Sequence, residues 1–179
     1  MCVCDYRGLG YADLTVLTAW FSQKRIAKTV TSLALGGNPG LVGDLDSEGE
    51  LAKSDVYSMQ FEDFMSHLVL HPTNAEVLDL SGCGIGTRSI GFIDKWIASD
   101  GNNSGLPGVL KVNSTADDMA QVTYTLNSTA KSLDFKDRLL GVDDVKLLVA
   151  VSFQWKNPDV PLKNVDFTLR NVGFLLNKC

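Results

Sequence analysis

Two histidines four residues apart, His67 and His71, are the residues of this sequence best spaced to bind a metal ion. Side chains at positions i and i+4 share one face of a helix, so both imidazoles could reach the same ion. A third ligand would have to come from elsewhere, with Glu62 or Asp63 as the candidates. Histidines at a helix end beside a proline, here Pro72, are usually surface residues, and we therefore predict no metal site.

A glycine-rich turn follows a short apolar stretch at residues 77–86, with the sequence VLDLSGCGIG. It is similar to the first motif of Rossmann-like methyltransferases, in which glycines after a strand let the backbone approach S-adenosylmethionine. Three features differ from that family: Ser81 lengthens the turn, Asn113 stands where an acidic residue would bind the ribose hydroxyls, and only about 90 residues follow. An S-adenosylmethionine-dependent methyltransferase is therefore the alternative function and not the first one.

No set of nucleophile and base can be recognised in the sequence. It has only two histidines, and no Ser-His-Asp order is visible. The four cysteines are too sparse for a disulfide scaffold, which leaves free thiols at Cys2, Cys4, Cys83 and Cys179. We predict no catalytic residue and no cofactor, and we interpret the chain as a non-enzyme.

Composition predicts one globular domain. The chain has 179 residues, of which 45% are hydrophobic and 21% charged, enough for a real core. The net charge of -5 argues against a nucleic-acid surface. No stretch has the length of a membrane span, and no signal peptide is recognisable, so we expect an intracellular protein, cytoplasmic or cytoskeletal, with an organellar site also compatible. Three glycosylation sequons, at Asn102, Asn113 and Asn127, would matter only in a secreted protein.

Hydrophobic spacing predicts short strands alternating with helices. We expect a flexible start over residues 1–10 and one helix over 11–28 that caps an end of the core. Further helices are expected around 61–68, 90–97, 114–126 and 142–153, with an acidic surface insertion at 44–58 and a loop at 99–108. Strands are expected near 33–35, 75–80, 109–112, 130–135 and 163–167.

The strand segments share one spacing of apolar residues. Offsets of 0, 3, 5 and 8 fit two of them fully, at Val30, Leu33, Leu35, Asn38 and at Ala75, Leu78, Leu80, Cys83. The first three offsets recur, with arginine at the fourth, at Ala130, Leu133, Phe135, Arg138 and at Leu162, Val165, Phe167, Arg170. This is the frame of a leucine-rich repeat, in which the Asn or Cys turns inward to satisfy backbone groups beyond the strand.

Residues 78–86, followed by an apolar helical stripe at Ile90, Ile93 and Ile97, resemble a ribonuclease-inhibitor-type leucine-rich repeat. That resemblance implies an α/β fold: a short solenoid with parallel strands on the concave face and helices outside, within a single degenerate repeat domain over 11–179. The steps between successive strand leucines depart from the usual 20–29 residues, being 45, 32, 23 and 32. We attribute the excess of the first step to the segment 44–58 and that of the second step to the segment 99–108.

Such a solenoid would bind another protein on its concave face, as a scaffold subunit of a multi-subunit complex. The residues between the inward positions would face that partner: Ser32, Ala34, Glu76, Asp79, Lys111, Ser132, Asp134, Asn164 and Asp166. Several are acidic, which predicts a partner with a basic or mixed-charge surface and no nucleic-acid partner.

Overall fold

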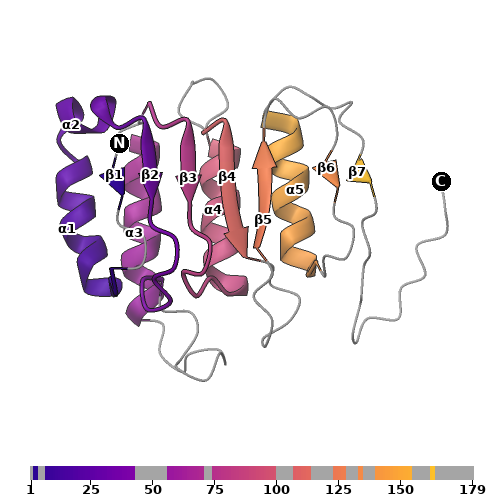
Figure 1. The fold of residues 1–179 in the computed structure, drawn as a ribbon, viewed down its shortest axis with the longest axis horizontal. Coiled ribbons are helices and arrows are strands. Elements are labelled where there is room, and N and C mark those ends of the chain that lie inside the picture. Colours follow the sequence, from indigo (N-terminus) through magenta and orange to yellow (C-terminus); the bar gives the residue numbers. More distant parts are fainter. Residues whose placement is uncertain are drawn as a thin grey trace.

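The chain folds as an α/β structure with one main sheet. The computed structural model describes residues 2–3, 7–42, 56–70, 74–99, 107–113, 123–127, 133–134, 140–154 and 162–163. Five strands lie in the sheet in their order along the chain: β1 (Cys2–Val3), β2 (Ser32–Ala34), β3 (Val77–Asp79), β4 (Val109–Asn113) and β5 (Thr123–Asn127). Strands β1 to β4 are parallel, and β5 is antiparallel to β4 (Figure 1).

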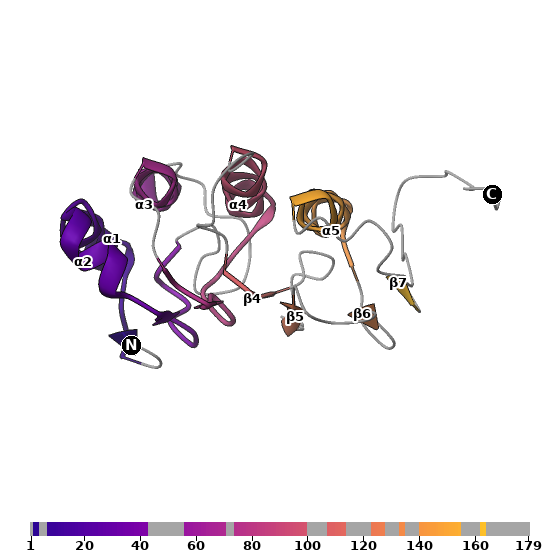
Figure 2. The same ribbon diagram turned by 90° about the horizontal axis from the view of Figure 1, so that it is seen from above.

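All the described helices lie on one face of this sheet. Their bounds are α1 (Tyr11–Phe21), α2 (Lys24–Thr29), α3 (Val56–Leu70), α4 (Thr87–Ser99) and α5 (Val142–Gln154). Figure 2 shows the two layers edge-on, with helices outside and strands inside a shallow arch. Each parallel step between strands crosses over through helices on the same side of the sheet.

The core lies between the two layers. Strand residues at alternate positions point into it, so Leu33, Leu78 and Leu110 are all at least 98% buried. The helical stripes meet them from the other side: Phe61, Phe64, Met65 and Leu68 on α3, and Ile90, Ile93, Trp96 and Ile97 on α4, are all buried. The helix periodicity in the sequence predicted both stripes, and the structure confirms them.

The repeat frame also predicted the strand register. Leu33 is paired with Leu78, as the shared offsets require. Leu78 is paired with Leu110, which lies in a predicted strand outside the full frame. The ladder continues past the strands, because the backbone N–H of Gly37 donates to the carbonyl of Ser81 at 2.7 Å. Successive coils therefore stack through their turns as well as their strands.

Asn38, the last residue of the first repeat frame, is fully buried and bonded to two coils. Its Nδ2 donates to the carbonyls of Leu35 and Gly36 at 2.6 and 3.2 Å. Its Oδ1 accepts from the backbone N–H groups of Arg7 and Leu9 at 3.1 and 3.0 Å. The side chain satisfies backbone groups that no strand partner reaches, which is the role the frame assigned to it.

Cys83 occupies the matching position of the next coil. It is fully buried, and its thiol donates to the carbonyl of Leu35 at 3.1 Å. One coil further on, buried Asn113 accepts a hydrogen bond from the backbone N–H of Gly82 at 2.5 Å. This burial also means that the sequon at Asn113 cannot carry a glycan in the folded chain.

The amino-terminal part differs from expectation in two ways. The predicted single helix over 11–28 is wrong, because α1 ends at Phe21 and α2 begins at Lys24. At the break, the Ser22 hydroxyl donates to the carbonyl of Ala19 at 2.7 Å, and such bonds compete with helix propagation. Residues 1–10 were expected to hold no regular element, whereas Cys2–Val3 forms β1 beside β2.

A helix predicted over 114–126 is also wrong where the structure describes it, because Thr123–Asn127 is strand β5. Tyr124 and Leu126 point into the core while Thr125 is exposed, so the burial period is that of a strand. Only nine residues, 114–122, separate β4 from β5. A parallel crossover needs a dozen or more, so this short connection leaves β5 antiparallel.

The last two predicted strands do not extend the parallel sheet. Strands β6 (Leu133–Asp134) and β7 (Leu162–Lys163) pair with each other in a separate two-stranded sheet. Leu133 is opposite Leu162, whereas the repeat frame placed it opposite Val165. Of the five predicted strands, only the first three, β2, β3 and β4, are therefore consecutive parallel neighbours, and β1, the fourth parallel strand, was not predicted.

Strand β5 is tied to α5 by a buried polar pair. The Tyr124 hydroxyl donates to Asp144 Oδ1 at 2.9 Å, and the backbone N–H of Gly141 donates to Asp144 Oδ2 at 2.7 Å. A carboxylate in the first helical turn that reaches back to the N-cap N–H stabilises the start of the helix. Burial, together with the nearby Asp144 charge, raises the pKa of Tyr124 well above its usual value.

Candidate functional site

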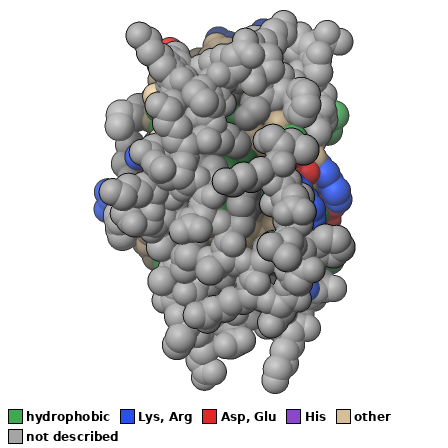
Figure 3. Space-filling view, turned by 90° about the vertical axis from the view of Figure 1, so that its right-hand side faces the viewer, with side chains coloured by type: hydrophobic (Ala, Val, Ile, Leu, Met, Phe, Trp, Pro, Cys, Tyr) green, Lys and Arg blue, Asp and Glu red, His purple; other side chains and the backbone are tan. Residues whose placement is uncertain are grey.

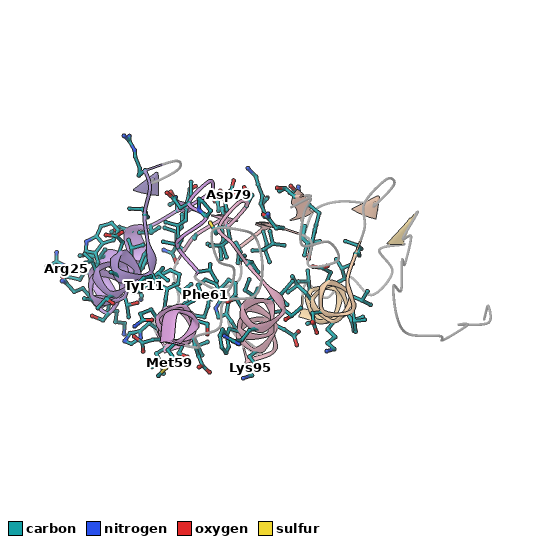
Figure 4. The ribbon with its side chains drawn as sticks, turned by 90° about the horizontal axis from the view of Figure 1, so that it is seen from below. Tyr11, Arg25, Met59, Phe61, Asp79 and Lys95 are labelled. Atoms are coloured by element: carbon teal, nitrogen blue, oxygen red, sulfur yellow. The ribbon has the colours of Figure 1, made fainter. Side chains whose placement is uncertain are left out.

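The sheet face turned away from the helices is the main candidate surface. Among the residues that the structure describes, no helix covers it (Figure 2). We call it the open face, and its side chains come from alternate positions on four strands: Ser32, Ala34, Val77, Asp79, Val109, Lys111, Thr123, Thr125 and Asn127. In Figure 4, Asp79 points out from this side, opposite Met59 and Lys95 on the helical side.

The register aligns these side chains into two rows that cross the sheet. The first row runs through Ser32, Val77, Val109 and Asn127. The second row runs through Ala34, Asp79, Lys111 and Thr125. Most of these side chains are small or β-branched, so the surface is shallow and carries no long anchor except Lys111.

The charged centre of the open face is an ion pair between neighbouring strands. Lys111 Nζ lies 2.8 Å from Asp79 Oδ2. The other carboxylate oxygen of Asp79 accepts from the Ser81 hydroxyl at 2.6 Å and from the Ser81 N–H at 3.0 Å. Burial alone would raise the pKa of Asp79, but the bonds from Lys111 and Ser81 outweigh it and hold the pKa below its usual value. The face therefore has a balanced pair where the sequence suggested acidic character.

Glycines at the ends of β2 and β3 allow successive turns to touch. Gly82 and Gly84 have φ of +66° and +68°, a region that side chains other than glycine rarely adopt. A Cβ at Gly84 would collide with the carbonyl of Pro39, and one at Gly82 would lie 3.3 Å from Gly37 Cα. The space beside the glycine-rich turn is therefore filled by the preceding turn at Gly37 and Pro39.

The sequence-predicted binding residues fall into three groups. Ser32, Ala34, Asp79 and Lys111 lie together on the open face. Glu76 is exposed and precedes β3 by one residue, so it lies at the beginning of this central strand and outside the two rows. Asp134 belongs to β6 in the separate sheet, and its side chain is outside the described part. The remaining three, Ser132, Asn164 and Asp166, lie outside the described residues.

Sequence reasoning missed the apolar residues of the face, Val77 and Val109, and the β5 residue Thr125. Strand alternation around the inward Leu78 would have placed Val77 outside, in preference to Glu76. Alternation along the strand indicates the outward positions more reliably than the polarity of the residues does. Thr125 was not predicted to lie on a sheet, because it falls within the helix predicted over 114–126.

A small hollow lies on the outer, helical side between α3 and α4. It has a volume of about 180 Å³ and is lined by Glu62, Met65, Ser66, Val69, Phe92, Lys95 and Trp96. Lys95 Nζ lies 5.4 Å from the centre of the Phe92 ring. Lys146 and Asp143 pair at 2.7 Å on α5, and Figure 3 shows basic and acidic side chains side by side at the right edge of its view. The outer side therefore has mixed charge with one small apolar hollow.

Neither a metal centre nor a membrane span is found in the described part. There, no three His, Cys, Asp or Glu side chains gather closely enough to hold an ion. His67 lies on α3 with its Nδ1 3.0 Å from the carbonyl of Asp63, and His71 is outside the described residues. None of the helices in these ranges combines the length and the apolar character needed to cross a bilayer. Comparison of the chain with protein-family models, curated proteins and solved structures gives no match in any of the three.

Proposed function

We propose that the chain is a short leucine-rich-repeat-like solenoid that binds another protein on its open face, as a non-enzymatic scaffold subunit of a larger assembly. The observation that carries this proposal is a parallel sheet with all its described helices on one side. In most α/β proteins helices cover both faces of a parallel sheet. Solenoids are the exception, and they use the uncovered strand face for binding.

The shape and charge of the open face favour a protein over a small ligand. Its rows of small and β-branched side chains offer a broad, shallow contact rather than a concave pocket. Its central ion pair, Asp79 with Lys111, is partly exposed and could exchange partners with either sign of charge. We therefore expect a partner with mixed charge, in an intracellular complex.

A methyltransferase remains the second candidate, and two observations weigh against it. The described strands follow each other in sequence order, whereas a doubly wound sheet reverses its order at the ligand crevice. The carbonyl of Pro39 fills the space beside Gly84. Titration calorimetry with S-adenosylmethionine separates the two candidates, because micromolar binding would favour the enzyme.

The binding proposal is tested with matched surface variants. Ala34→Arg and Val109→Arg would each place a long cation on the open face, and Met59→Arg would place one on the outer side of α3, where Met59 is 61% exposed. Quantitative affinity capture would compare the wild type with each variant. We expect a partner retained by the wild type and by Met59→Arg but lost by both open-face variants. Retention by all of them would refute the open face as the binding surface.

A further inference from the structure

Helix α1 is apolar on the side that faces away from the protein. Its inner side packs on α3, with the Phe21 and Phe64 rings edge to face at 6.0 Å. On its outer side Val16 is 68% exposed and Trp20 is 38% exposed. The other exposed outer residues are Ala12, Thr15 and Ala19, and the exposed part of α1 carries one charge, on Asp13. A helix that is apolar all round is typical of one packed between two neighbours.

Beside α1, the strand layer of the described residues also has an unpaired edge. Strand β1 pairs with β2 along one edge, and no strand among the described residues pairs with its other edge. Exposed strand edges invite pairing with another strand. In Figure 2, α1 and β1 lie at the same end of the helix layer and the strand layer, and no described element covers either of them there. We call this surface, made of the outer side of α1, the free edge of β1 and helix α2, the amino-terminal end face.

Charges on the amino-terminal end face are separated along α1. Asp13 lies in the first turn of α1, whereas Lys24, Arg25 and Lys28 follow its last turn on α2 and are all exposed. Arg25 extends away from the molecule at this end in Figure 4. If two α1 helices packed in parallel, the basic groups would face each other. If they packed antiparallel, Asp13 of each would approach α2 of the other.

We propose that the amino-terminal end face binds a second copy of this chain, forming a two-fold dimer in which α1 packs antiparallel on α1 and the β1 edges adjoin. A two-fold axis makes the interface isologous, so one patch supplies both sides. The same axis covers the apolar helix face, satisfies the strand edges and pairs the separated charges. A foreign partner would have to match all three features independently.

The interface is small, which sets the affinity. Helix α1 has 11 residues and is therefore about 16 Å long. With the short β1 edge, the dimer buries less than the roughly 1,200 Å² of a standard interface. We therefore expect a dissociation constant on the order of 10–100 μM, with weaker association at high salt.

Sedimentation equilibrium of the full chain, from about 5 to 500 μM, tests the dimer. Val16→Glu should raise the dissociation constant at least tenfold, and Lys24→Glu with Lys28→Glu should also weaken association. Val149→Glu on α5, where the valine is 46% exposed, is the matched control and should leave the dimer unchanged. Circular dichroism would confirm that each variant is folded, which is expected since all these side chains are exposed.

Three results would overturn the proposal. The wild type could remain monomeric at every concentration. A folded Val16→Glu variant could dimerise as tightly as the wild type, which would place the interface elsewhere. Val16→Glu and Val149→Glu could weaken dimerisation equally, which would mean that added negative charge, and not the α1 surface, causes the loss. None of these results bears on the open face, which lies on another surface.

Discussion

Replacing Asn38 with alanine should destabilise the protein strongly. The side chain is fully buried and makes four hydrogen bonds to backbone groups, two as donor and two as acceptor. Alanine leaves these groups without a partner in a space too closed for easy hydration. The substitution also removes the hydrogen bonds by which the turn at Asn38 is connected to Arg7 and Leu9.

The magnitude follows from the number of bonds. A hydrogen bond contributes about 1 kcal/mol net, and a buried group left unpaired costs about 1–3 kcal/mol. Four bonds to Asn38 therefore give an expected loss of about 4 kcal/mol. With a urea m-value of about 2 kcal/mol per molar for a domain of this size, the unfolding midpoint should fall by about 2 M.

Urea unfolding followed by circular dichroism measures this shift. Asn74→Ala is the matched control, because Asn74 is exposed and makes one bond, from its Nδ2 to the carbonyl of Lys28 at 2.7 Å. It should cost under about 1 kcal/mol. Cys83→Ala should fall between the two, since a thiol is a weak donor. If Asn38→Ala and Asn74→Ala shift the midpoint equally, the inward asparagine does not hold the coils together.

Three further substitutions test the turn, the buried pair and the open face. Gly84→Ala should lower Tm by at least about 5 °C, because it adds backbone strain and a collision with Pro39. Gly91→Ala in α4, which has open space beside it, should raise Tm. Shifts of the same sign in the two variants would contradict this account of the turn. The raised pKa of Tyr124 means that the folded state keeps a proton that the unfolded chain loses near pH 10, so stability should fall above that pH, and less steeply in Tyr124→Phe; parallel curves of urea midpoint against pH would refute the assignment. The pKa of Asp79 is lowered, so its contribution is present above about pH 4 and is lost as the pH falls further; the stability advantage over Asp79→Asn, under about 1 kcal/mol because the pair is partly exposed, should vanish by about pH 2, and an unchanged difference would count against the ion pair.

The sequence was most informative where apolar residues recur at the same offsets in successive strands. The offsets shared by Leu33 and Leu78 predicted their pairing, and the 32-residue step to Leu110 predicted the next. Inward burial at these positions is enforced, since a shift by one residue would turn every leucine to solvent. For the same reason the inward positions of Asn38 and Cys83 could be predicted.

Prediction failed where the local sequence does not determine the direction of a strand or the strand with which it pairs. The segment around Tyr124 has residues compatible with either a helix or a strand, and its pairing with β4 decided the outcome. Strand polarity depends on the length of the connection, which the spacing of apolar residues does not encode. On the candidate site, composition suggested an acidic surface, whereas the pairing of Asp79 with Lys111 depends on a neighbouring strand 32 residues away.

The reversed direction of β5 limits how this architecture could be lengthened. The strands before it are all parallel, so an extra strand-and-helix module inserted between β2 and β4 would meet neighbours of matching polarity. A module added after β5 would meet a strand that runs the opposite way, and the coil-by-coil growth would stop there. An inserted module would therefore match the strand direction of both its neighbours before β4 but not beyond β5.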